Sequence, residues 1–139
     1  MADPKLALLR KVPLFIDCDR RSMEAINQHA DEVDLPDGAV LAKEGDLGQQ
    51  FFLILSGTVR IERAGQVIAR LGPGDFLGEI ALVYEGRRTA TATAEGPVRA
   101  AVLTHRTFDS LMAEHPALSR TVMLALAARV RQLERDAVG

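Results

Sequence analysis

Residues 74–92 read GDFLGEIALVYEGRRTATA, and this stretch is the most informative part of the chain. It opens on a glycine-rich bend, enters a short apolar segment at Glu79 and returns through a loop to an arginine pair. Gly78 lets the backbone turn sharply and approach a ligand, because it carries no Cβ. The first N–H groups of a short helix starting near Glu79 lack backbone partners, and those of Ile80 and Ala81 suit a phosphate. We therefore expect this stretch to bind a small anion.

Arg88 and Glu79 would supply complementary contacts to such a ligand. The guanidinium of Arg88 is a planar fork that can bond two phosphate oxygens at once. A carboxylate at an anion site has a role if Glu79 accepts a hydrogen bond from a sugar hydroxyl. A singly charged phosphodiester with a free 2′-hydroxyl describes a 3′,5′-cyclic nucleotide better than ATP, and no G-x-x-x-x-G-K-[ST] loop occurs. The alternatives are a surface strand arginine and a helix N-terminal charge.

Length and composition restrict the class of protein. The 139 residues fit one domain, and the apolar fraction of 47% is ordinary for a globular protein. A net charge of −2 gives no broad positive field for nucleic acid or anionic lipid. The single cysteine, Cys18, excludes an internal disulfide framework and favours a reducing compartment. Charged residues interrupt the N-terminal apolar residues and no run is long enough to span a bilayer, so we expect a soluble, cytoplasmic protein.

Short apolar runs broken by glycine surround this stretch and predict β-structure. An Ala-Gly turn at residues 64–65 joins two of these runs. Turn signals recur every 8 to 12 residues or so, which is typical of a small antiparallel sandwich or barrel. The expected strands are residues 40–41, 51–55, 58–63, 67–71, 88–94 and 98–103.

Helical patterns predict helices at both ends of the chain. Residues 5–12, ended by Pro13, and residues 20–29 form the first pair. Two further helices flank Pro116, and the last has an apolar stripe. This stripe consists of Leu118, Val122, Leu126, Val130 and Leu133. We expect one domain over residues 1–139, with N-terminal helices at 1–30, a β-roll at 31–104 and C-terminal helices at 106–136.

The central motif resembles the phosphate-binding cassette of the cyclic nucleotide-binding domain family. The segment FLGEIAL at residues 76–82, followed by RTAT at 88–91, carries the resemblance, with the cassette spanning 76–91. That family includes catabolite-activator-type bacterial regulators, the regulatory subunit of cAMP-dependent kinase and cyclic nucleotide-gated channels. Framework likenesses extend it over nearly the whole chain: VPLF at 12–15, GD at 45–46, residues 52–57 with Val59, and HP at 115–116. The resemblance implies a mainly β fold, a jelly-roll-like antiparallel β-roll with flanking helices.

The resemblance also implies roles for individual residues. Glu79 would hold the ribose 2′-hydroxyl and Arg88 the cyclic phosphate. Thr89 could reach a phosphate oxygen or the exocyclic amine of guanine, which leaves the base preference open. On the last helix, Leu133 would cover the base as an apolar lid, since no polar contact to adenine is reproduced there. The expected nucleotide contacts are Leu77, Gly78, Glu79, Ile80, Ala81, Leu82, Arg88, Thr89 and Ala90.

These observations predict a non-catalytic sensor of a cyclic nucleotide, with cAMP favoured over cGMP as the ligand. We expect no other cofactor and no metal. Binding would move the C-terminal helices, and the apolar stripe would cover the barrel, form a homodimer or both. Three alternatives stay open: a transcription regulator whose DNA-binding part is absent from this chain, a metal-dependent barrel enzyme, and a degenerate scaffold. Scattered histidines, without an H-x-H pair, argue against the enzyme. We expect Tyr84 to pack in the core and Arg87 to face solvent.

Overall fold

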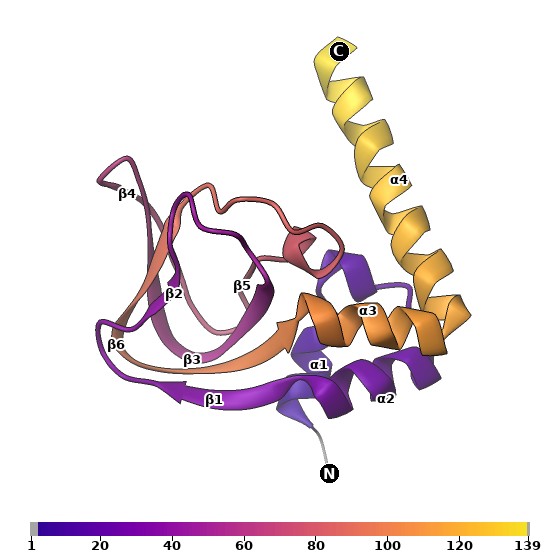
Figure 1. The fold of residues 1–139 in the computed structure, drawn as a ribbon, viewed down its shortest axis with the longest axis horizontal. Coiled ribbons are helices and arrows are strands. Elements are labelled where there is room, and N and C mark those ends of the chain that lie inside the picture. The colour runs from indigo at the N-terminus through magenta and orange to yellow at the C-terminus, as the bar shows by residue number, and fades with distance from the viewer. Residues whose placement is uncertain (1–2, 139) are drawn as a thin grey trace. The chain divides into compact units, whose positions relative to one another are not determined.

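The computed structural model describes residues 3–138, in which helices flank a set of β-strands in sequence (Figure 1). Gln28–Asp109 forms one compact unit that contains all the strands, and the segments on either side of it in the sequence form a second. No helix within residues 3–138 has both the length and the apolar character needed to cross a bilayer.

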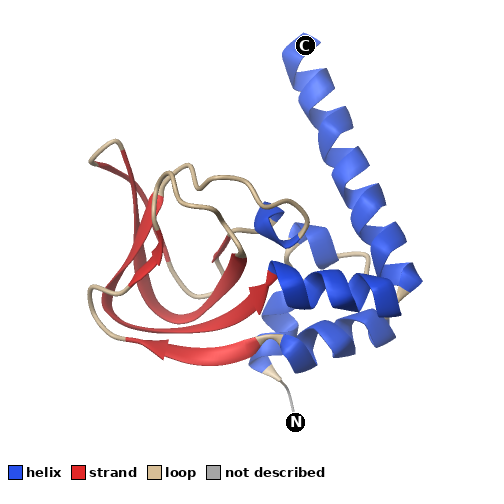
Figure 2. Cartoon of the chain, in the orientation of Figure 1, coloured by secondary structure: helices blue, strands red, loops and turns tan. Residues whose placement is uncertain are grey.

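The strands form one antiparallel sheet that curls into a roll (Figure 2). The sheet order is β1-β6-β3-β4, with β2 paired to β6 and β5 paired to β3. This arrangement confirms the predicted fold class, an antiparallel β-structure with helices before and after it. The strands are β1 Asp31–Leu35, β2 Val40–Ala42, β3 Gln50–Arg63, β4 Gln66–Leu71, β5 Phe76–Leu77 and β6 Thr91–Thr104.

The two central strands, β3 and β6, are longer than the sequence pattern predicted. Each runs for 14 residues, where we expected four separate strands with breaks near Gly57 and at residues 95–97. Gly57 has φ 91° and Gly96 has φ 79°, and the β3–β6 register shifts on both sides of Ser56. Glycine in this conformation bends a strand without ending its pairing. The prediction was wrong because these glycines are bends inside long strands. The expected strand start at Arg88 was also wrong, since β6 begins at Thr91.

The turn between β3 and β4 confirms the predicted hairpin. Ala64 has φ 51° and Gly65 has φ 80°, while Arg63 and Gln66 pair across the turn. Two successive left-handed residues give the hairpin a twist that matches the flanking strands.

The inside of the roll is filled by apolar side chains of alternating strand positions. Alanines on β6 face bulkier residues such as Phe52 and Ile54 on β3, so small and large side chains interlock. The buried cluster comprises Leu41, Ala42, Phe52, Ile54, Val59, Ala92, Ala94, Val98 and Ala100. This packing fixes the strands that carry the cassette.

The helices begin and end close to the predicted residues. α1 Pro4–Leu9 starts one residue earlier than expected, because Asp3 caps it and Pro4 occupies its first turn. It ends at Leu9, three residues before the predicted end. α2 Arg20–His29 matches its prediction. The remaining helical elements are the 3₁₀ turns η1 Pro13–Phe15 and η2 Ile80–Leu82, and the helices α3 His105–Glu114 and α4 Pro116–Val138.

The apolar stripe of α4 is covered only along its first half. Leu118 and Val122 are buried, whereas Val130 and Leu133 are 54% and 61% exposed. The second half of the stripe is therefore an exposed apolar surface of this chain.

Candidate functional site

The cassette backbone is held by β3 and by a single 3₁₀ turn. β5 pairs with β3, Gly78 follows with φ 80°, and Glu79 leads into η2. The Ala81 N–H donates to the Gly78 carbonyl at 3.0 Å. We expected this N–H to have no backbone partner, and that expectation was wrong because a 3₁₀ turn forms bonds between residues three apart. The result is a tight turn whose shape is set by Gly78.

A cavity of about 620 Å³ lies against this turn and is lined by both Glu79 and Arg88. Glu79 is only 8% exposed, so its carboxylate is withdrawn from bulk water. Of the predicted contacts, Leu82 and Ala90 are not among the lining residues, and Leu82 is fully buried. The full lining is Gly48, Phe76, Leu77, Gly78, Glu79, Ile80, Ala81, Tyr84, Gly86, Arg87, Arg88 and Thr89.

Arg88 is anchored at both its backbone and its side chain. Its N–H donates to the Asp46 carbonyl at 2.7 Å, and its carbonyl accepts from the Gly45 N–H at 2.9 Å. Its Nη2 donates to the Gln50 carbonyl at the start of β3. These bonds hold the guanidinium at the cavity.

The guanidinium of Arg88 is half-buried and has no acidic counter-ion among residues 3–138. Burial lowers the pKa of this guanidinium from its usual value, because removal from water disfavours the charged form. Arginine nevertheless stays charged at neutral pH. The cavity therefore contains a positive charge that an anion would stabilise.

Two glycines leave the space that the guanidinium occupies. A Cβ built on Gly78 would lie 2.5 Å from Arg88 Nη1 and closer still to the Gln50 carbonyl oxygen. A Cβ on Gly48 would lie 2.8 Å from Arg88 Nε. Gly48 was not among the predicted site residues, because its contact with Arg88 joins residues 40 positions apart and leaves no local signal in the sequence.

The sequence profile of the cyclic nucleotide-binding domain matches residues 32–115. The chain belongs to this family. The matched segment contains the whole cassette and all the strands except the first residue of β1.

Known members of the family resemble the chain over different spans. A CRP-like cAMP-activated global transcriptional regulator from Mycobacterium tuberculosis is 28% identical over 134 residues, which is 93% of this chain and 60% of that protein. The cAMP-dependent protein kinase regulatory subunit of Schizosaccharomyces pombe is 32% identical over 107 residues, 76% of this chain and 26% of that protein. This chain therefore spans less than two thirds of either relative.

A solved structure shows the same fold over most of the chain. The N-terminal domain of a transcriptional regulator from Streptomyces coelicolor A3(2) has a TM-score of 0.83 at 30% identity. The similarity covers 91% of this chain and 94% of that structure.

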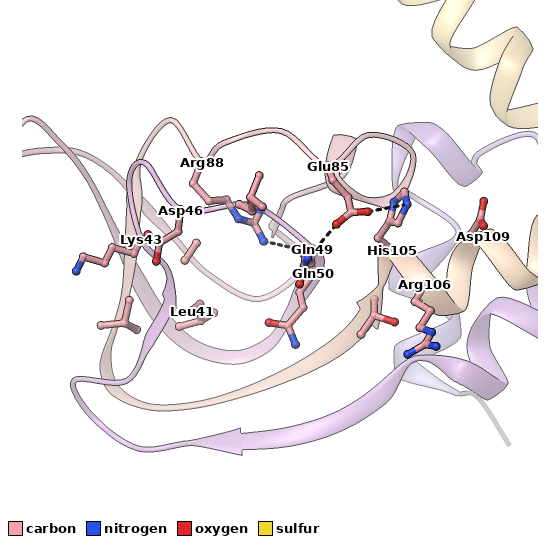
Figure 3. Close-up of a pocket in the computed structure, with 14 residues that line it drawn as sticks. Leu41, Lys43, Asp46, Gln49, Gln50, Glu85, Arg88, His105, Arg106 and Asp109 are labelled. Carbon is pink, nitrogen blue, oxygen red and sulfur yellow. Dashed lines mark hydrogen bonds and ion pairs between the residues drawn. The ribbon is translucent and has the colours of Figure 1, made fainter.

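Arg88 of this cyclic nucleotide-binding domain also lines a second cavity, of about 880 Å³ (Figure 3). Its wall combines β2 with charged side chains such as Lys43, Asp46 and Glu85, and with the first turn of α3. Glu79 and Gly78 are not among its lining residues. Of these two cavities within the described residues, the smaller is the one lined by both Arg88 and Glu79, and we take it as the candidate nucleotide site.

The structure also places Tyr84, Arg87, Thr89 and Leu133. Tyr84 is 69% exposed at the smaller cavity, so the expectation of core packing was wrong. Arg87 is exposed as expected, and its Nη1 donates to the Gly45 carbonyl at 2.8 Å. Thr89 is exposed at the same cavity. Leu133 lies on the exposed part of α4, and its contact with a base stays a prediction.

Proposed function

We propose that this chain binds a 3′,5′-cyclic nucleotide in the cavity lined by Glu79 and Arg88, and that it acts as a non-catalytic regulatory sensor. The observation that carries the proposal is the half-buried guanidinium of Arg88, which lines this cavity and forms no ion pair with an acidic side chain among residues 3–138. Charged groups withdrawn from water are normally paired. An anionic ligand is the partner that this arrangement fits.

Arg88 would bind the cyclic phosphate through the part of its fork that the Gln50 carbonyl does not use. A hydrogen bond to a charged group contributes about 1.5–3 kcal/mol. Removing one partner of a desolvated charge pair costs roughly 2–5 kcal/mol. A substantial part of the free energy of binding would therefore depend on this side chain.

Glu79 would accept a hydrogen bond from the ribose 2′-hydroxyl. Its withdrawal from water favours this, because a buried carboxylate gains more from a donor than an exposed one. The Gly78 N–H would assist at the phosphate, and the Thr89 hydroxyl would contact a phosphate oxygen or the base. Leu82 and Ala90 are retained only as supporting residues of the cassette, since neither lines the cavity.

Cyclic AMP is the ligand we favour over cyclic GMP. The relatives from M. tuberculosis and S. pombe are described as cAMP-activated and cAMP-dependent, respectively. Thr89 keeps cGMP as the second candidate, because its hydroxyl could accept a hydrogen bond from the guanine amine.

As a sensor, the domain would shift between conformations that differ in affinity for the nucleotide. The exposed apolar part of α4, around Val130 and Leu133, would form the lid over the base, the seam of a homodimer or both. The single cysteine, which cannot form an internal disulfide, favours a cytoplasmic setting. The alternative is the effector part of a transcription regulator, favoured by the M. tuberculosis relative, of which this chain covers 60%.

Titration calorimetry on nucleotide-stripped protein tests the proposal. Arg88→Ala should weaken cAMP binding about 100-fold, and Arg88→Lys about 10-fold, because lysine keeps the charge and loses the fork. Arg99→Ala is the matched control, since Arg99 forms an ion pair with Asp34 at 2.8 Å and lines neither cavity. No heat from either cyclic nucleotide with the wild-type protein would overturn the proposed function.

A further inference from the structure

The first residue of α3, His105, reaches the phosphate-binding turn through its ring. His105 Nδ1 lies 3.0 Å from the carbonyl oxygen of Ala81 in η2. A carbonyl oxygen can only accept, so this ring nitrogen carries the proton. The Ala81 N–H already donates to Gly78, and Ala81 is only 7% exposed. The turn is therefore held at Ala81 from both sides, by its own backbone and by the imidazole.

The imidazole is itself held by Glu85 and Gln49 (Figure 3). His105 Nε2 lies 3.5 Å from Glu85 Oε1, and this contact is an ion pair in the imidazolium form, in which both ring nitrogens carry a proton. The other carboxylate oxygen of Glu85 accepts from Gln49 Nε2 at 2.9 Å, and the Gln49 carbonyl accepts from the His105 N–H at 2.8 Å. The three residues form a closed loop of polar contacts, which restricts rotation of the ring.

The same end of β3 also anchors the guanidinium. Gln50, the neighbour of Gln49, accepts from Arg88 Nη2. Two adjacent residues therefore position both parts of the phosphate site, Arg88 directly and the turn through His105. The Nδ1 contact joins the turn to the start of α3, because His105 is the first residue of that helix.

We propose that His105 is a positioning residue for nucleotide binding: its Nδ1–H holds the Ala81 carbonyl, and Glu85 with Gln49 holds its ring. The proposal deepens the proposed function and rests on it. His105 does not line the smaller cavity and would not touch the nucleotide. It keeps the turn that carries Gly78 and Glu79 in the shape that receives the phosphate and ribose, and it links that turn to α3.

Two substitutions separate this role from simple packing. His105→Asn keeps an N–H donor close to the Nδ1 position, whereas His105→Phe keeps the ring volume and removes the donor. Loss of one buried hydrogen bond predicts cAMP binding roughly 3- to 10-fold weaker in His105→Phe, and within about 2-fold of wild type in His105→Asn. A packing role predicts the reverse order. Equal affinities, or weaker binding by the asparagine variant, would overturn the proposal.

The contact itself is tested by the carbonyl ¹³C chemical shift of Ala81, measured without nucleotide. It should move upfield in His105→Phe and stay near the wild-type value in His105→Asn. An unchanged shift in His105→Phe would refute the contact. This measurement needs no ligand, so it still judges the contact if the wild-type protein binds neither cyclic nucleotide and the proposed function fails.

A third variant tests whether Glu85 orients the imidazole of His105, and it changes a side chain that is partly exposed to solvent. Glu85 is 42% exposed at its side chain, so Glu85→Gln should fold normally. Weaker orientation of the imidazole predicts cAMP binding about 2- to 3-fold weaker. Glu114→Gln, at the last residue of α3, is the control and should bind as wild type. Equal binding by both variants would remove Glu85 from the proposal.

Discussion

Gly78→Ala should damage both folding and nucleotide binding, for reasons that three matched variants can separate. Gly78 combines a left-handed backbone, φ 80°, with atoms that a Cβ built on it would approach too closely. Gly96 has nearly the same backbone, φ 79°, with nothing within 4 Å of a built Cβ. Gly48 needs no left-handed conformation, and the three atoms nearest to its built Cβ all belong to the flexible Arg88 side chain, with Nε at 2.8 Å. Gly78→Ala thus combines backbone strain with steric overlap of the new Cβ. Gly96→Ala has the backbone strain alone, and Gly48→Ala has the steric overlap alone.

The expected free energies of unfolding follow from these differences. An alanine in the left-handed region costs about 1–2 kcal/mol, and its stiffer unfolded chain returns about 0.4–1 kcal/mol. Gly96→Ala should therefore destabilise the protein by about 1 kcal/mol. Overlap in a packed site adds about 1–3 kcal/mol, so Gly78→Ala should cost about 2–4 kcal/mol. Its neighbour at the Gln50 oxygen is backbone and cannot move aside cheaply.

Urea unfolding at 25 °C measures the stabilities, and calorimetry with cAMP measures the affinities. Gly96→Ala should lose stability and keep its affinity. Gly48→Ala should keep its stability within about 1 kcal/mol and bind roughly 10-fold more weakly, because the displaced guanidinium loses a charged hydrogen bond. Gly78→Ala should lose both. Equal unfolding free energies for Gly78→Ala and Gly96→Ala would refute the close packing at the turn.

Three further predictions concern single side chains. Burial, with smaller effects of two neighbouring aspartates, raises the pKa of the Cys18 thiol from 9.0 to about 11. Its alkylation rate below pH 9 should therefore be about 100-fold lower than that of a thiol with the usual pKa. An ordinary alkylation rate at pH 8 would contradict this. Because the folded-state pKa is the raised one, Cys18 favours folding below pH 9, and this contribution should fade between pH 9 and about 11 in urea unfolding. Thr89→Ala should weaken cGMP binding about 5-fold more than cAMP binding, and equal losses would mean that Thr89 does not contact the base. Thr104→Ala removes the oxygen that accepts from the Thr107 N–H at 3.1 Å and should destabilise the protein by about 1 kcal/mol, with Thr104→Ser as a control that keeps the hydroxyl.

The fold class could be predicted from local sequence, whereas the strand lengths could not. Alternating residues and the Ala64-Gly65 turn indicate antiparallel strands wherever they occur. Gly57 and Gly96 look like turn residues by the same rules, yet both lie inside 14-residue strands. Whether a glycine ends a strand or bends it depends on the partner strand, and that partner is distant in the sequence.

The cassette residues were predicted from one contiguous motif, and the contacts that support them were not. Glu79 and Arg88 line one cavity, as the motif suggested. Gly48, Gln50 and His105 hold the arginine and the turn from other parts of the chain. Tyr84 was misjudged because apolar character alone does not say whether a loop side chain is covered.

By itself the sequence determined the family, the strand-rich fold and the pair of charges that suits a cyclic nucleotide, because each depends on residues close together in the chain. The tertiary structure alone decided that the guanidinium lies against two bare glycines and that a histidine of α3 holds the turn. Contacts of this kind depend on which segments the roll brings together. That pairing comes from burying the apolar faces of β3 and β6 over the whole sheet, and no short stretch of sequence encodes it.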